Sequence, residues 1–126
     1  MKKVIYTDKA PSPIGPYSQA IMVGNMLYIS GQIALDAATN KIIQGSIKDE
    51  TRQIMDCIRH ILEAAGMTFD NVVKTTIFLK DMNNFVHVNE AYGSYFTKDF
   101  PARATVEAPR LPTDANVEIC MEAIKF

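Results

Sequence analysis

Short stretches in which apolar residues alternate with polar or small ones recur along this chain, and each predicts a β-strand. The predicted strands cover residues 3–6, 17–23, 26–30, 71–80, 102–108 and 115–124. Gly24 and Asn25 join the second strand to the third, and a Gly-Asn link between apolar runs is typical of a tight hairpin. In the fourth strand the alternation places four residues on one face: Val73, Thr75, Ile77 and Leu79.

The apolar spacing becomes helical between residues 48 and 65. One stripe there consists of Ile54, Cys57, Ile58, Ile61, Leu62 and Ala65. Ser46 with Asp49 is a start signal, and Gly66 is a natural stop. A second helix is predicted from Asn83 or Asn84 to about Phe96, with a stripe of Phe85, Val88, Asn89, Tyr92, Tyr95 and Phe96. A single apolar stripe indicates packing against one face of a sheet.

The order of these elements is typical of an α+β sandwich, with a mixed β-sheet and both helices on one face. The proline-rich segment 10–16 is expected to be an ordered loop, and residues 36–45 a polar connection. A chain of 126 residues is expected to form one domain over residues 1–126. If the other sheet face carries apolar side chains, a partner subunit is its expected cover.

The charge pattern argues against nucleic acid as a partner, because the net charge is −1 and the basic residues are scattered. No apolar run has the length of a membrane span, and the first residues, MKKVIYTDK, lack an apolar signal segment. Cys57 and Cys120 have no metal-like spacing and fit a reducing compartment. We therefore expect a cytoplasmic protein without membrane or nucleic-acid contacts.

The segment Pro101 to Leu111, PARATVEAPRL, carries the strongest candidate chemistry. Its alternation puts Arg103, Thr105 and Glu107 on one side of a short strand. The planar guanidinium of an arginine suits a carboxylate or a phosphate, although Arg103 could equally be half of a surface ion pair. Glu118 on the last strand is its candidate partner, and a nearby arginine would favour the ionised form that can orient a water. The alternative is a salt bridge without a catalytic task.

Three further polar residues are weaker candidates. Asn89 lies on an apolar helical stripe, so its amide either bonds a loop backbone or lines a cleft. Tyr17 and Ser30 lie at strand ends and could as easily satisfy local backbone groups. His60 and His87 have no ligands at metal-binding spacing, so no metal site is predicted.

Several stretches together resemble the Rid family of reactive-intermediate deaminases, also called the YjgF family. They are residues 14–20 (IGPYSQA), 29–32 (ISGQ), 72–92 (VVKTTIFLKDMNNFVHVNEAY) and 101–103 (PAR), with Leu111-Pro112 and 117–119 (VEI). The match runs in order from about residue 4 to residue 124. The resemblance implies a fold like chorismate mutase of the trimeric type, and a homotrimer with clefts between its subunits.

The resemblance also implies roles for individual residues. Arg103 would bind the substrate carboxylate and Glu118 would position the hydrolytic water. Tyr17, Ser30 and Asn89 match positions that line the same cleft, while backbone groups at Gly31 and Thr105 would help to hold the substrate. The chain departs from the family at Thr105, where many members have cysteine, at Cys57, where asparagine is common, and at Pro109, where alanine is usual.

The implied activity is hydrolysis of reactive 2-imino or enamino acids, such as 2-iminobutanoate and 2-iminopropanoate, to 2-keto acids and ammonia. No cofactor is expected. Because Thr105 replaces the common cysteine, a thiol at that position is not essential if the activity is shared. One alternative is a regulatory protein that binds a small carboxylate without turnover. Another is the endoribonuclease activity of some relatives, against which the near-neutral charge argues.

Overall fold

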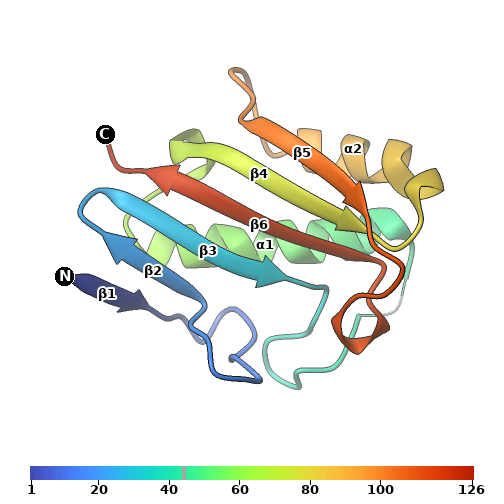
Figure 1. Ribbon diagram of the computed structural model, residues 1–126, viewed down its shortest axis with the longest axis horizontal. Helices are drawn as coiled ribbons and strands as arrows, with labels where there is room; N and C mark the ends of the chain where they lie inside the picture. Colours follow the sequence, from blue (N-terminus) through green and yellow to red (C-terminus); the bar gives the residue numbers. More distant parts are fainter. Residues whose placement is uncertain (44) are drawn as a thin grey trace.

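The computed structural model describes residues 1–43 and 45–126, and these form one six-stranded sheet. Its strands are β1 (Lys2–Ile5), β2 (Ala20–Val23), β3 (Met26–Gln32), β4 (Val72–Leu79), β5 (Ala102–Glu107) and β6 (Val117–Ile124). They lie side by side in the order β1-β2-β3-β6-β4-β5 (Figure 1). All neighbouring strands are antiparallel except β4 and β5, which are parallel. The last strand of the chain therefore lies inside the sheet.

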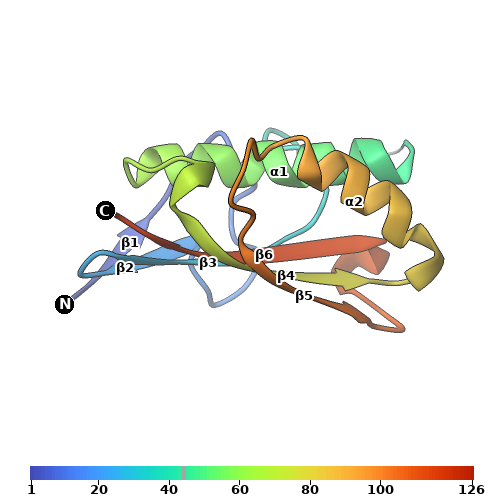
Figure 2. The ribbon, with the colours of Figure 1, turned by 90° about the horizontal axis from the view of Figure 1, so that it is seen from above.

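Helices cover one face of this sheet and leave the other open (Figure 2). They are α1 (Ile47–Ala64) and α2 (Phe85–Gly93), and three single 3-10 turns accompany them: η1 (Phe69–Asn71), η2 (Met82–Asn84) and η3 (Pro112–Asp114). In the described part of the chain, no helix has the length and apolar character needed to cross a bilayer. The α+β sandwich predicted from the sequence, with both helices on one face of a mixed sheet, is confirmed.

The local signals of α1 are those read from the sequence. The Ser46 hydroxyl accepts a hydrogen bond from the Asp49 amide, and the Asp49 carboxylate accepts one from the Ser46 amide. The predicted stripe is buried against the sheet, with Ile54, Ile58, Ile61 and Leu62 fully inaccessible. Gly66 follows the helix with φ +73°, a conformation that favours glycine.

Helix α2 is shorter than predicted and ends at Gly93 instead of Phe96. Beyond it, the amides of Tyr95 and Phe96 donate to the carbonyls of Tyr92 and Gly93, a three-residue spacing that tightens the backbone out of the α-helical path. Tyr95 and Phe96 still pack against the core through an aromatic cluster with Phe69. The predicted stripe was therefore right for contact and wrong for helix length.

The strands also differ from the alternation in detail. Val73 is exposed and Val72 is buried, because the pairing of β4 with β6 skips one residue between Val72 and Lys74. The strand predicted from residue 17 begins only at Ala20. The predicted connection 36–45 includes residue 44, which lies outside the described residues.

The face of the sheet without helices carries apolar side chains. Val4 and Val23 lie there at one edge, Tyr28 near the middle and Val106 on β5, with Tyr28 and Val106 each 46% exposed. The other face is a closed core between the sheet and the helices. One layer of this molecule is thus complete, and the opposite layer is open.

Candidate functional site

A β-bulge in β3 forms the floor of the main cavity. Ile29 pairs with Met121 and Gln32 with Ile119, so three steps along β3 match two along β6. The extra residue lets both Ile29 and Gln32 turn into the core. Ser30 and Gly31 are left at the irregularity, where bulges often re-aim side chains beside a site.

Gly31 lies directly against the carboxylate of Glu118. A Cβ atom at position 31 would lie 1.9 Å from Glu118 Oε2 and 2.8 Å from its Cδ. Any side chain there would displace the carboxylate or the backbone. The absence of a Cβ is therefore what allows Glu118 to occupy its position over the bulge.

A buried glutamine holds the proline-rich loop beside this position. Gln19 is 2% exposed, and its amide nitrogen donates to the carbonyls of Thr7 and Pro11, each at 3.0 Å. Its side-chain oxygen accepts the Thr7 amide at 2.8 Å. These bonds satisfy a buried amide and confirm that segment 10–16 is an ordered loop.

Tyr17 and Ser30 are fixed by backbone groups of the same region. The Ser30 hydroxyl donates to the Ser18 carbonyl at 2.6 Å, and the Ile14 amide donates to the Tyr17 hydroxyl oxygen at 3.4 Å. The Tyr17 side chain is about half exposed. Both residues thus make the local contacts considered for them from the sequence, and both also line the cavity.

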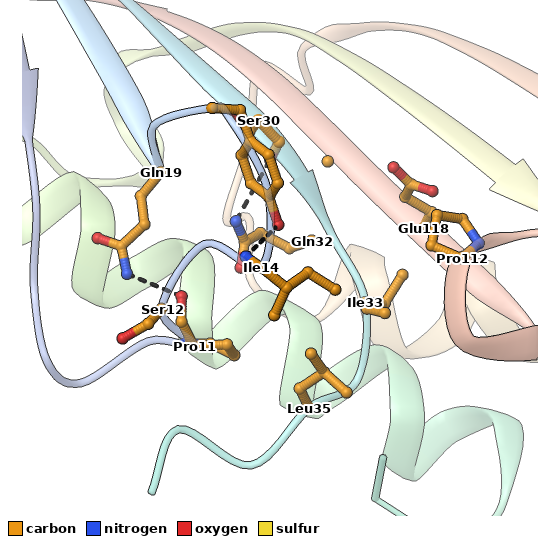
Figure 3. Close-up of a pocket in the computed structure, with 12 residues that line it drawn as sticks. Pro11, Ser12, Ile14, Gln19, Ser30, Gln32, Ile33, Leu35, Pro112 and Glu118 are labelled. Atoms are coloured by element: carbon orange, nitrogen blue, oxygen red, sulfur yellow. Dashed lines mark hydrogen bonds between the residues drawn. The ribbon is translucent and has the colours of Figure 1, made fainter. Parts of the chain in front are cut away.

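We call this space the Glu118 cavity; its volume is about 400 Å³. Its polar lining includes Tyr17, Ser30, Gly31 and Glu118. Its apolar lining comes from the loop, the segment after β3 and η3: Pro11, Ile14, Ile33, Leu35 and Pro112. Figure 3 shows Ile14, Ile33 and Leu35 lower in the view than Ser30 and Glu118. The volume lies within the range of small-molecule sites.

Burial raises the pKa of the Glu118 carboxyl above its ordinary value of 4.5. In the described part of the chain this carboxyl group joins no ion pair and accepts no hydrogen bond. The expectation that Arg103 holds Glu118 ionised within one chain is therefore wrong. The cause of the raised pKa is desolvation of the carboxylate.

Arg103 lies on the other face of the sheet. It pairs with Thr75, which pairs with Met121, and both of these partners are buried under the helices. Glu118 pairs with Phe78 on the opposite pleat, and β4 separates β5 from β6. The sequence predicted neighbouring strands because the link from residue 108 to 114 is short. That link instead passes around the end of β4.

Two aromatic rings of α2 position the Arg103 guanidinium. Its central carbon lies 5.5 Å from the Phe85 ring centroid and 5.3 Å from that of Tyr92. Tyr92 is itself fixed, because its hydroxyl donates to Thr75 Oγ1 at 2.9 Å. Contacts with ring faces leave the N–H edge of the guanidinium available. Within the described residues Arg103 forms no ion pair, so the surface ion-pair interpretation fails there.

Asn89 and Arg103 line a second hollow of about 320 Å³, which we call the Arg103 recess. Tyr92, Gly93, Phe100 and Pro101 complete its lining. The Asn89 side chain is half-buried and lines this recess, one of the two roles considered for it. Six of the seven predicted site residues thus line one of two separate hollows of the chain: Tyr17, Ser30, Gly31 and Glu118 line the first, and Asn89 and Arg103 the second. Thr105 lines neither.

The remaining polar residues of β5 have separate surroundings. The Thr105 hydroxyl is buried without a hydrogen-bond partner. The Glu107 carboxylate accepts the Met82 amide at 2.8 Å, at the start of η2. Glu107 is therefore committed to the backbone, whereas Thr105 retains an unused hydroxyl beside Arg103.

Sequence reasoning missed three residues that shape these hollows. Gln19 follows Tyr-Ser in an otherwise apolar strand start, and that isolated amide was the available signal. Phe85 and Tyr92 were assigned to the core alone, although they also stack on Arg103. Within residues 1–43 and 45–126, no group of three or more histidine, cysteine or acidic side chains could hold a metal ion.

The sheet order, the helix layer and the two hollows place this chain among small α+β sandwich domains of the chorismate-mutase-like type. The family model described as endoribonuclease L-PSP matches residues 7–125. The chain belongs to this family, the Rid or YjgF family.

Similar proteins match the chain over nearly its whole length. A RutC family protein of Pyrococcus horikoshii is 54% identical over 126 residues, which are 100% of this chain and 98% of that protein. A mouse protein named 2-iminobutanoate/2-iminopropanoate deaminase is 48% identical over 119 residues, 94% of this chain and 88% of its own.

Solved structures similar to this chain also cover nearly its whole length. A putative endoribonuclease of Thermotoga maritima has a TM-score of 0.97 at 44% identity, covering 100% of this chain and 99% of its own. A conserved Rid-family protein of Yersinia pestis has a TM-score of 0.96 at 47% identity, covering 99% and 100%.

Proposed function

We propose that this protein hydrolyses 2-imino acids to 2-keto acids and ammonia, at sites that two copies of the chain build together. The observation that carries the proposal is the division of the site. Among the described residues, an acidic cavity without a cation and a guanidinium without an anion lie on opposite faces of one sheet. Relatives named 2-iminobutanoate/2-iminopropanoate deaminase, at 46–48% identity, support this choice of reaction.

The Arg103 recess of one subunit would hold the substrate carboxylate. A carboxylate accepts two parallel N–H bonds from a guanidinium, and Arg103 joins no ion pair within the part of the chain that the structure describes. Asn89 lines the same recess, and the backbone of Thr105 follows Arg103 on β5. These groups fix the acid end of the substrate and its orientation.

The Glu118 cavity of a neighbouring subunit would supply the water. In its ionised form Glu118 accepts a proton as the water oxygen bonds to the carbon of the protonated imine, which produces a carbinolamine. Glu118 returns this proton to the nitrogen and then takes the hydroxyl proton as the C–N bond breaks, so that ammonia leaves, the C=O bond forms and the last proton passes to solvent. Tyr17 and Ser30 line this cavity: the Tyr17 hydroxyl can donate to a developing polar atom and the Ser30 oxygen can accept a hydrogen bond, while Gly31 leaves room for the carboxylate.

A homotrimer is the assembly we propose. The uncovered sheet face carries apolar side chains, and a second subunit would remove them from water. In a closed ring each subunit contacts the next one through one surface and the previous one through a different surface. The Arg103 recess of one subunit can therefore face the Glu118 cavity of its neighbour. A cytoplasmic location stays part of this proposal.

The direct test follows imine consumption. The imine is generated by an amino-acid dehydratase or oxidase, and the rate of trapping by a competing reagent is measured with and without the protein. Arg103→Ala and Glu118→Gln should each lower the acceleration by about a hundredfold or more. Arg110→Ala, a change of another exposed arginine near the same segment, is the matched control. Wild-type protein that equals the enzyme-free reaction would end the proposal.

A second candidate is a protein that binds small carboxylates without turnover. The Arg103 guanidinium favours it, because it is exposed and joins no ion pair among the described residues, and an arginine binds a carboxylate without a general base. Saturable binding of 2-keto acids without any imine hydrolysis, at pH values where Glu118 is ionised, would select this candidate.

A further inference from the structure

We infer that the apolar end of the Glu118 cavity binds the side chain of the substrate, and that this protein prefers 2-imino acids whose apolar side chains are longer than ethyl. The inference rests on the proposed function and adds a substrate class to it. Iminopropanoate and iminobutanoate carry only a methyl or an ethyl group. Neither would fill the space beside Glu118.

In a single subunit the Glu118 cavity has a volume of about 400 Å³, and sites of roughly 300–1,000 Å³ hold ligands of drug-like size. A substrate of a few atoms that contacts only Glu118 and Ser30 would leave the lower part of the cavity to water (Figure 3). Binding becomes more favourable when an apolar group displaces that water, because apolar surface of both the wall and the ligand is removed from water.

Glu118 and Ser30 lie apart from the apolar wall of the cavity. Glu118 and Ser30 lie at one end, and Ile14, Ile33 and Leu35 lie toward the other (Figure 3). With the carboxylate held by Arg103 and the reacting carbon beside Glu118, the side chain is the part of the substrate left to reach the isoleucines.

The other polar side chains along this cavity have partners in the chain. The Ser12 and Tyr6 hydroxyl groups bond to each other at 3.2 Å, and the Gln19 amide donates to Pro11 at 3.0 Å. The Gln32 amide donates to the Ser30 carbonyl at 3.5 Å. Several of the polar groups here are thus already engaged, so a polar substrate side chain would lose its water and gain few partners in exchange. The cavity therefore selects for apolar groups.

The apolar wall combines a rigid and an adjustable part. Ile33 and Leu35 are buried and belong to a small cluster with Leu111 and Ala115. Ile14 lies on the loop and is 61% exposed, so it can adjust to chains of different length. Because Ile14 is outside the core clusters, it can be replaced without opening a cavity in the core.

The test uses the assembled wild-type protein and an unbranched series of imines, made by an amino-acid oxidase from alanine, 2-aminobutyrate, norvaline and norleucine. We expect kcat/KM to rise about fourfold with each added methylene, the gain of burying one methylene group. The imine from glutamine, which has a polar side chain of similar length, should be at least about tenfold poorer than that from norleucine.

Two variants locate the effect. Ile14→Ala should reduce the ratio of norleucine-derived to alanine-derived kcat/KM by about four- to tenfold. Val86→Ala removes an equally exposed valine from α2, 59% exposed and away from the cavity, and should leave that ratio at the wild-type value.

Calorimetric titration with the matching 2-keto acids, from pyruvate to 2-ketohexanoate, measures the same gradient without catalysis. A flat or falling series in both assays, with the alanine-derived imine still hydrolysed, overturns the inference and leaves the proposed function intact. If no imine is hydrolysed but the dissociation constants fall with chain length, the proposed function is lost and the subsite stands.

Discussion

The Glu118 cavity and the Arg103 recess position their charged groups by different means. Backbone geometry positions Glu118, because a bulge in β3 and a glycine without a Cβ leave space for its carboxylate. Side chains position Arg103, because two rings of α2 stack on its guanidinium. The carboxyl group is half-buried and has a raised pKa, whereas the arginine is exposed.

The two hollows carry opposite charges, and each lacks the charge that the other provides. Glu118 has no cation nearby in the described chain, and Arg103 has no anion. They lie on opposite faces of one sheet, with β4 between their strands. Under the proposed function, a single chain thus contains both halves of a site and cannot close it, and the contact between subunits completes the chemistry as well as the fold.

The largest effect is expected from mixing two inactive variants. Arg103→Ala and Glu118→Gln protein, unfolded together and refolded as mixed oligomers, should recover about one quarter of wild-type activity, because about a quarter of random interfaces join two intact halves. Imine hydrolysis measures the recovery. Mixing the folded variants without exchange is the control. No recovery after confirmed exchange would contradict a shared site.

A charge on the open face should break the assembly. Tyr28 projects from the middle of β3 opposite Glu122, so Tyr28→Asp adds like charge to a surface that the proposal buries. We expect association to weaken by about a hundredfold or more, and activity to fall with it. Light scattering measures the mass, and Val86→Asp on α2 is the control. An unchanged oligomer would show that another surface makes the contact.

The position of the Glu118 side chain can be changed without removing its carboxylate. Gly31→Ala places a Cβ where Glu118 Oε2 lies, and we expect kcat/KM to fall about ten- to a hundredfold. Gly15→Ala meets the Tyr17 ring at an ordinary 3.5 Å and should have little effect. Steady-state kinetics and thermal unfolding together separate misplacement from misfolding. Equal activity for both variants would mean that the close approach does not matter.

The smallest effect is the pH dependence that Glu118 adds to stability. Its folded pKa is raised above 4.5, so its stabilising contribution is present below that value and is lost as pH rises through the folded pKa. In a Tyr28→Asp background, Glu118→Gln should remove this loss, which amounts to at most about 1 kcal/mol for a half-exposed group. Urea unfolding across this pH range measures it. A stability difference between the two proteins that does not change with pH would contradict the assignment to burial.

Several elements were predictable because their signals are local. The Ser46–Asp49 capping box, the Gly24-Asn25 hairpin and the stripe of α1 each involve residues only a few positions apart. The resemblance likewise indicated the family and its fold. Backbone preference and apolar spacing act over such short distances, and tertiary packing agreed with them here.

The end of α2 was less predictable. Its apolar stripe continues through Phe96, but the helix ends at Gly93 and the aromatic residues reach the core from a turn. The spacing of apolar residues predicts which side chains are buried. It does not predict whether the backbone that carries them keeps α-helical hydrogen bonds. The same limit explains Val73, which a bulge moved to the outside.

The sequence by itself determined the class of fold, the loop and helix caps, and the identity of the candidate residues. Only the tertiary structure decided that Arg103 and Glu118 lie apart, because strand order follows from pairing between distant segments, and β4 took the place between β5 and β6. It also decided how Glu118 sits, because one extra residue in β3 sets the bulge over it. The alternation of residues predicts which side chains share a face of one strand. Only the pairing of all the strands decides which side chains of different strands lie together in a site.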